Sequence, residues 1–266
     1  MLSMGIEAIR EAVELTLISG QLENEQPGSI LITAEVEEGK THLVARYKNL
    51  DGVAYLADAS AFGILRAYQQ DLQQGRLKHL IFPELIRPLE RQQETASALV
   101  AFLGELMEEG VKEIHTYATD FKLPQPVKAG VIACIARGNL KHRINYWNQT
   151  GFLSRFLVIS YSYGDDTANK VMNDIILRKT DGEGMFVLPR RAKVNLPPEI
   201  GQLLTTSSVR MAKGLYAPLH GYRMQKHLQR LVMASALRAG RDTVTKEDLI
   251  TILDILGYVN LDYKAV

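Results

Sequence analysis

Short apolar runs alternate with longer amphipathic segments along the first two thirds of the chain. Apolar runs of strand length cover residues 29–33, 53–56, 77–82, 113–117, 130–135 and 156–161. Apolar positions at helical spacing predict helices over 4–20, 39–47, 61–73 and 94–109. About five strands that alternate with helices predict an α/β fold whose mostly parallel sheet is covered on both faces.

The pattern changes after about Thr180. An extended, basic connector covers residues 188–198, and helical patterns follow over 199–204, 222–239 and 246–256. The last of these helices has a capping-box pattern, with Thr245 as N-cap and Asp248 three residues later. We therefore predict an α/β nucleotide-binding domain over residues 1–190 and a small helical domain over residues 191–266.

The overall charge excludes some modes of binding. In 266 residues the formal net charge is only +1, with 46% apolar and 23% charged residues, which is typical of a globular protein. A chain with this balance does not attract nucleic acid or acidic membranes as a whole. Binding of that kind would need a local basic patch.

The single cysteine and the lack of long apolar segments predict a cytoplasmic protein. Cys134 lies in an apolar run and excludes both an internal disulfide and a cysteine-rich metal site. No segment resembles a signal peptide, and no apolar run reaches the roughly 20 residues that span a bilayer. We expect no membrane partner.

The segment after the first predicted strand nearly matches the phosphate-loop pattern G-x-x-x-x-G-K-[ST]. It comprises Ala34, Glu35, Val36, Glu37, Glu38, Gly39, Lys40 and Thr41, and His42 follows. It follows a strand and begins a helix, where its amides can surround a triphosphate. Lys40 would reach the β- and γ-phosphates and the Thr41 hydroxyl would ligate Mg²⁺. ATP and Mg²⁺ are therefore the predicted cofactors, held by residues 34–42.

Two features of this segment count against a phosphate loop. Ala34 replaces a glycine at a position that can need positive φ. Glu35, Glu37 and Glu38 add negative charge beside a polyanion. The alternative is a strand, turn and helix that contain Gly-Lys-Thr by chance.

A phosphate-loop ATPase also needs an acid at the end of a neighbouring strand, which holds Mg²⁺ and orients the attacking water. Glu84 is our candidate, because it follows the apolar run 80–82 and Pro83. It would serve as metal contact or as catalytic base, with Asp58 as a supplement. The alternative is that Glu84 only caps a helix. Because a second adjacent acid is missing, the hydrolysis rate is left open.

The segment 151–159 resembles the L-S-R-F-D-L-I-F segment of minichromosome-maintenance helicases and related AAA+ ATPases. It contains Leu153-Ser154-Arg155-Phe156, and Leu157 stands where the family has aspartate. The resemblance implies that Arg155 is an arginine finger, which reaches the γ-phosphate bound by the neighbouring subunit. A fixed guanidinium suits this role because it neutralises charge on the transferred phosphoryl group.

A second block is similar to the lid helix of the same family. Residues 223–234 are similar to R-x-L-E-x-x-x-R-L-x-x-A, and residues 244–249 resemble the family's V-T-x-x-D. The resemblance implies that Arg223 is the sensor-2 residue and that Arg230 lies on the same helix face. The alternative is that both arginines are solvated surface charges. Phosphate loop, finger and lid helix occur in the family's order, which implies a P-loop AAA+ core with a five-stranded sheet and a C-terminal helical lid.

Two further elements of that family are less distinct in this chain. The strand over 130–135 should end in a sensor-1 polar residue, but it ends at Ala136 and Arg137, so the residue is unassigned and Thr116 is another candidate. The loop over 119–129 falls where AAA+ helicases place a hairpin. Lys122 and Lys128 are its candidates for nucleic-acid contact, and the alternative is a plain surface loop.

Three functions follow from these observations. The first is an oligomeric AAA+ ATPase that acts on DNA as a helicase, helicase loader or motor. Each site would be shared between copies in a ring, for example a hexamer, with Lys40, Thr41 and Glu84 from one copy and Arg155 from the next. The second is a nucleotide-sensing module with little or no hydrolysis, and the third is a protein-remodelling AAA+ ATPase. A partner protein would direct the chain to its target, since the sequence has no separate DNA-binding domain.

Overall fold

A parallel sheet forms the centre of the computed structural model, which describes residues 6–116, 119–177, 186–215, 220–260 and 264–265. Its neighbouring strands are, in order, β2 (Val53–Tyr55), β3 (His79–Phe82), β6 (Gly130–Ala136), β1 (Ile30–Ala34) and β7 (Leu157–Ser162). The two-residue strand β8 (Lys264–Ala265) pairs with β7. All of these pairings are parallel, which confirms the predicted α/β class.

The register fixes which residues share an edge of the sheet. β1 lies between β6 and β7, with Ile30 beside both Ile132 and Leu157. All five residues of β1 are buried, as expected for a parallel strand covered on both faces. Because the strands are parallel, the residues after each strand gather at one edge and the residues before each strand gather at the other.

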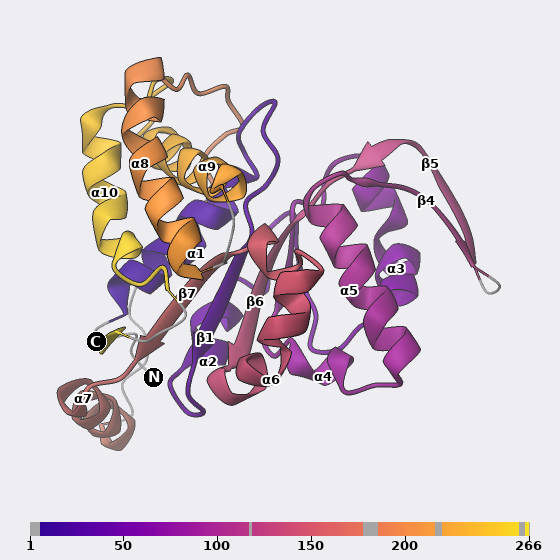
Figure 1. Cartoon of the computed structure of the whole chain (residues 1–266), viewed down its shortest axis with the longest axis horizontal. Coiled ribbons are helices and arrows are strands. Elements are labelled where there is room, and N and C mark those ends of the chain that lie inside the picture. Colours follow the sequence, from indigo (N-terminus) through magenta and orange to yellow (C-terminus); the bar gives the residue numbers. More distant parts are fainter. Residues whose placement is uncertain (1–5, 117–118, 178–185, 216–219, 261–263, 266) are drawn as a thin grey trace.

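Most helices of the first two thirds pack around this sheet, whereas the helix over 165–176 lies apart from it (Figure 1). The helix predicted over 61–73 is confirmed, but two helices were missed. Both carry apolar residues at helical spacing, such as Leu140, Ile144 and Trp147 in the first of them, and the prediction overlooked this pattern. The helices are α1 (Glu7–Ser19), α2 (Lys40–Ala45), α3 (Ala61–Gln73), α4 (Ile86–Leu89), α5 (Gln93–Met107), the two missed helices α6 (Arg137–Gln149) and α7 (Asp165–Ile176), and the 3₁₀ turn η1 (Leu153–Arg155).

The run over 113–117 does not belong to the main sheet. It forms β4 (Val111–Thr116), which pairs antiparallel with β5 (Thr119–Val127). The proline-containing segment after 119 is therefore a strand of a hairpin that projects from the body (Figure 1). Thr116 consequently does not end a strand of the main sheet, and its proposal as a sensor-1 residue is wrong.

Three long helices form the C-terminal part: α8 (Pro198–Leu215), α9 (Tyr222–Arg238) and α10 (Lys246–Leu256). α8 is longer than the predicted 199–204, whereas α10 begins and ends as predicted. Its capping box between Thr245 and Asp248 is present. α1 packs against α9 and α10, so the first helix and the last helices share one apolar core with the sheet. The boundary near residue 190 remains a prediction.

Buried aromatic residues link α6 to the start of β7. Trp147 is 2% exposed and its ring meets that of Phe152 edge-on at 5.1 Å. Phe152 in turn contacts Phe156 at 5.2 Å. Tyr146, next to Trp147 in the sequence, does not join this cluster and is 54% exposed.

Two histidines are buried in the neutral form. His79 lies against Gly130, where an added methyl group would be 2.6 Å from its ring and 2.1 Å from the Gly28 carbonyl oxygen. Burial lowers the pKa of His79 to about 3. Burial, reinforced by the charge of Arg230, likewise lowers the pKa of His227 to about 3. Both side chains must stay uncharged in the folded protein.

We predict that these histidines destabilise the protein in mild acid. The unfolded chain protonates them below about pH 6.5, whereas the folded chain does not until about pH 3, so the free energy of unfolding falls as the pH is lowered between these values. Between pH 7 and pH 5, His79→Gln should lose about 2 kcal/mol less than the wild type in urea unfolding. His142→Gln, at an exposed position, is the control. Equal losses in all three proteins would contradict the prediction.

Candidate functional site

The predicted phosphate loop connects β1 to α2 at the edge where the strands end. Glu37 and Gly39 have left-handed backbone, with φ of 71° and 73°. A side chain at Gly39 would also place its first carbon 2.6 Å from the Tyr163 hydroxyl. Ala34 is the last residue of β1 and has no positive φ. Alanine in place of the pattern's first glycine therefore causes no backbone strain, since the left-handed turns of the loop lie at Glu37 and Gly39.

Glu38 braces this loop from within. Its carboxylate accepts hydrogen bonds from the Glu35 amide at 2.7 Å, the Ser162 hydroxyl at 2.6 Å and the Tyr163 amide at 2.8 Å. The Glu38 carbonyl accepts a further bond from the Tyr161 hydroxyl at 2.6 Å. A buried carboxylate with three donors is well satisfied. Glu38 thus ties the loop to the end of β7 and points away from a ligand.

Lys40 lies over the loop. Its ammonium group donates to the Ala34 carbonyl at 3.0 Å and to the Glu35 carbonyl. Burial lowers the pKa of Lys40, and the nearby carboxylates of Glu38 and Glu35 act in the opposite direction. The Lys40 ammonium group thus donates to two neutral carbonyl oxygens and to no carboxylate. A phosphate group can take the place of a neutral carbonyl at a lower free-energy cost than it could displace a carboxylate.

Thr41 and Glu84 come from neighbouring segments. The Thr41 hydroxyl is 3.4 Å from the Pro83 carbonyl oxygen, so the end of β3 lies beside the loop. Glu84 follows directly, is about half exposed, and forms an ion pair with Arg87 at 2.5 Å. A hydroxyl and a carboxylate are oxygen donors of the kind that Mg²⁺ uses together with water and phosphate, so these residues fit the ion. Asp58 pairs instead with Arg91 at 2.5 Å.

Another cation follows β6 at the same edge. Arg137 is 8% exposed, donates to the Tyr161 carbonyl at 2.9 Å and lies 3.5 Å from the Glu35 carboxylate. Arg137 is the first residue of α6, and its side chain is buried beside the loop. Burial raises the pKa of the Cys134 thiol to about 12, so Cys134 is not a nucleophile.

The two arginines assigned through the family resemblance are brought together by one carboxylate. Arg223 donates to both Glu108 oxygens, one of them at 2.8 Å, and to the Ser154 hydroxyl at 2.7 Å. The Arg155 guanidinium lies 3.2 Å from Glu108 and donates to the Gly151 carbonyl at 2.8 Å. Burial alone would raise the pKa of Glu108, but the bond and charge of Arg223 and the charge of Arg155 outweigh it and lower that pKa.

This arginine pair lies at the edge opposite to the phosphate loop. Arg155 precedes β7, and the register places that position beside the start of β1, whereas Lys40 follows its end. At about 3.3 Å per strand residue the two levels are roughly 20 Å apart. Arg155 and Arg223 therefore do not reach the loop of their own chain.

The two lysines of the hairpin are not brought together. Lys122 is exposed on β5 and lies 3.7 Å from Glu113 on the paired strand. Lys128 follows the end of β5, about 20 Å away along the strand.

The sequence analysis did not predict the structural roles of three side chains. Glu38 was considered only as an unfavourable charge, and Glu108 was part of an amphipathic helix without a role. Arg230 was weighed as a solvated charge, which is wrong because it is 9% exposed. The only sequence signal for Arg230 was its position, seven residues after Arg223 on the same face of a helix.

No known protein-family model matches the chain, and no curated protein matches it. Among the described residues, no helix is both long and apolar enough to cross a membrane, and no group of three or more histidine, cysteine or acidic side chains could hold a metal ion.

We predict that Glu108 holds the arginine pair in place. Glu108→Gln should lower the free energy of unfolding by about 2 kcal/mol, because two largely buried guanidinium groups lose their counter-charge. Glu109→Gln is the matched control, since Glu109 is 61% exposed and 3.9 Å from Arg155, and it should change stability by less than about 0.5 kcal/mol. Equal effects in urea unfolding would show that Glu108 has no such role.

Proposed function

We propose that the chain is an AAA+-type ATPase that binds ATP with Mg²⁺ at the β1–α2 loop and completes each site with arginines from an adjoining copy. The observation that carries this proposal is the placement of two groups at opposite edges of one sheet. Lys40, Thr41 and Glu84 gather where the strands end, and Arg155 and Arg223 gather where the strands begin. Neither group is complete alone for phosphoryl transfer.

The chemistry of each group supports these roles. The left-handed turn at Glu37 and Gly39 leaves loop amides for phosphate oxygens, and Lys40 supplies a fixed positive charge. Bound Mg²⁺ would neutralise charge between the phosphates. Thr41 and Glu84 would hold that ion. Arg137 at the end of β6 adds a buried cation beside the loop, where the sequence left the sensor-1 residue unassigned.

The arrangement also supports assembly. Since Arg155 and Arg223 cannot reach their own loop, they would act on the nucleotide of a neighbour through a head-to-tail contact. Repetition of such a contact closes into a ring when the rotation allows it. The position of the pair at one carboxylate supports a common role for both arginines in that contact.

Glu84 supports a second candidate function, a nucleotide sensor with little hydrolysis. A single carboxylate follows β3, and Arg87 already engages it. A carboxylate oxygen that already accepts from a guanidinium group is less available to orient an attacking water. A DNA client, by contrast, rests on the family resemblance and on the exposed hairpin alone.

We predict that Lys40→Ala strongly weakens nucleotide binding. Loss of the ammonium group should weaken the affinity for a fluorescent ATP analogue with Mg²⁺ by about thirtyfold to a hundredfold, the value of one charge-assisted contact. Lys48→Ala, at an exposed position soon after α2, should bind like the wild type. Unchanged affinity in Lys40→Ala would overturn the assignment of the loop.

We predict that Arg155→Ala leaves ATP binding unchanged but lowers the ATP turnover rate about a thousandfold, as expected for an arginine finger. In a 1:1 mixture with wild type, the rate per wild-type subunit should fall, because mutant subunits leave their neighbours' sites incomplete. Arg66→Ala, at an exposed position of α3, is the control. Light scattering with an ATP analogue measures assembly in the same samples. An additive rate in the mixture would reject the shared site.

A further inference from the structure

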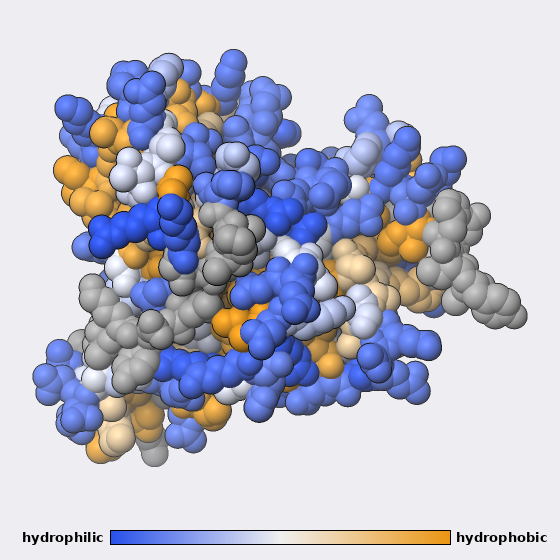
Figure 2. All heavy atoms as spheres, in the orientation of Figure 1, coloured by the Kyte–Doolittle hydropathy of each residue, from blue (hydrophilic) through white to orange (hydrophobic). Residues whose placement is uncertain are grey.

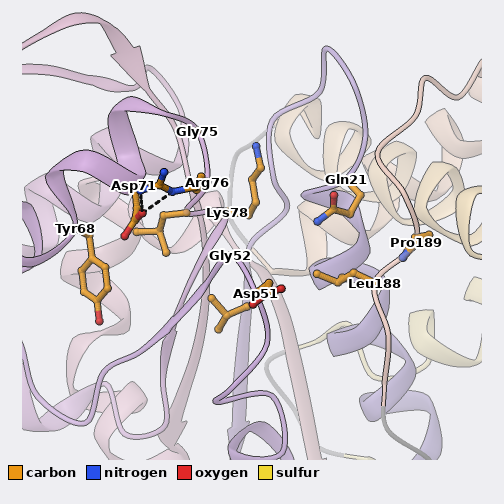
Figure 3. A pocket seen from close by; sticks show the side chains of 12 residues that line it. Gln21, Asp51, Gly52, Tyr68, Asp71, Gly75, Arg76, Lys78, Leu188 and Pro189 are labelled. Atoms are coloured by element: carbon orange, nitrogen blue, oxygen red, sulfur yellow. Dashed lines mark hydrogen bonds and ion pairs between the residues drawn. The ribbon is translucent and has the colours of Figure 1, made fainter.

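A hollow lies where the strands of the sheet begin, far from the phosphate loop. It has a volume of about 470 Å³, and it is bordered by the starts of β1, β3 and β6, by the connector near residue 191 and by α9. Its neighbour, of about 560 Å³, shares Lys78 with it and is shown in Figure 3, between the β2–β3 side and the residues Gln21, Leu188 and Pro189. Both volumes are in the range of ligand sites.

Four cationic side chains line the smaller of these two hollows: Lys78, Lys128, Arg191 and Arg230. Glu25 is the one acidic residue among its lining. Figure 2 shows hydrophilic residues over much of the visible surface. The sequence supplies charges of both signs in nearly equal number, with 31 Lys and Arg residues against 30 Asp and Glu residues. With a net charge of only +1 for the chain, this excess is not a consequence of composition.

The backbone holds these cations in place. The Lys78 amide donates to the Gly52 carbonyl at 2.8 Å, and the Lys78 carbonyl accepts from the Gly130 amide at 2.8 Å. Next to Arg191, the Ala192 amide donates to the Gln21 carbonyl at 3.1 Å and its carbonyl accepts from Glu23 at 2.9 Å. The backbone positions from which the Lys78 and Arg191 side chains extend are therefore fixed.

Of the four cations, Arg230 alone has a carboxylate within ion-pair distance in the described part of the chain, that of Glu25 at 3.9 Å. Within the described part of the chain, no ion pair engages Lys78, Lys128 or Arg191. Burial and then the charge of Arg191 lower the pKa of Lys78, which shows that the two cations are close. Arg155 and Arg223 differ in this respect, because Glu108 compensates them.

Arg230 gives the clearest indication that the hollow binds an anion. It is 9% exposed, its guanidinium Nε has no hydrogen-bond partner, and Glu25 is 3.9 Å away, too far for a hydrogen bond. A buried guanidinium donor without an acceptor is costly, and the cost is removed when an anion enters. Arginine is also the side chain best suited to phosphate.

We propose that the hollow bordered by Lys78, Lys128, Arg191 and Arg230 is a binding site for a ligand that carries consecutive phosphate groups. Its volume of about 470 Å³ is many times the volume of about 30 Å³ that one water molecule occupies. Its cations come from four separate segments, so more than one phosphate group can be held at once. This site goes beyond the proposed function and does not rest on it, since no residue of the phosphate loop takes part.

The test uses inorganic tripolyphosphate without Mg²⁺, measured by calorimetry on Lys40→Ala protein, in which the phosphate loop is disabled. We expect binding that weakens about tenfold for each charge removed by Lys78→Gln and Arg191→Gln. Lys193→Gln, exposed on the same connector and outside the hollow, is the matched control and should bind unchanged. Thermal unfolding shows whether each variant is folded.

The source of the phosphates is distinguished by a second ligand. If a 15-residue oligothymidylate competes with tripolyphosphate and loses affinity in Arg191→Gln, the ligand is a nucleic acid backbone, and binding should weaken with salt. If only tripolyphosphate binds, the ligand is a free oligophosphate. Absence of binding in Lys40→Ala protein, or equal binding by Arg191→Gln and Lys193→Gln, overturns the proposal. Loss of ATP binding in Lys40→Ala would still be seen in either case, so the two proposals fail separately.

Discussion

The parallel pairing of β1 with β6 on one side and β7 on the other determines where the chemistry of this protein lies. Because every strand of the main sheet runs in the same direction, the residues after the strands and the residues before them form two separate edges. Lys40, Thr41 and Arg137 are brought to the first edge, and Arg155 is brought to the second. A reversed β7 would place Arg155 beside its own phosphate loop and make the proposed sharing of sites unnecessary.

The sequence was sufficient to predict the fold class and most strands, because buried parallel strands leave unmistakable apolar runs such as 130–135. It failed where the apolar pattern is sparse or where pairing depends on distant segments. α6 is largely polar, and its contact with the core rests on Leu140, Ile144 and Trp147. The hairpin of β4 and β5 contains prolines and lies outside the main sheet, so its pairing depends on tertiary contacts that a local pattern does not carry.

The site was predicted in part for the same reason. The loop and the acid after β3 are local motifs, and the structure places them next to each other. The role of Glu38 is not local, since two of its three carboxylate donors come from Ser162 and Tyr163, more than 120 residues away. The apparent conflict between an acidic loop and a polyanion is thereby reduced. Glu38 is turned toward β7 and Glu35 faces Arg137. Of the three loop glutamates, Glu37 is therefore the one that meets no counter-charge or donor among the residues the structure describes.

The two edges also differ in electrostatic character, and this has a consequence for assembly. The loop edge carries charges of both signs, since Glu35 and Glu37 lie beside Lys40 and Arg137. At the opposite edge, Glu108 compensates Arg155 and Arg223, but Lys78, Lys128 and Arg191 line a hollow without ion-pair partners in the described part of the chain. A two-fold contact through that second edge would bring like charges together, which disfavours it. Head-to-tail association avoids this repulsion, and it is also the arrangement that the proposed shared site requires.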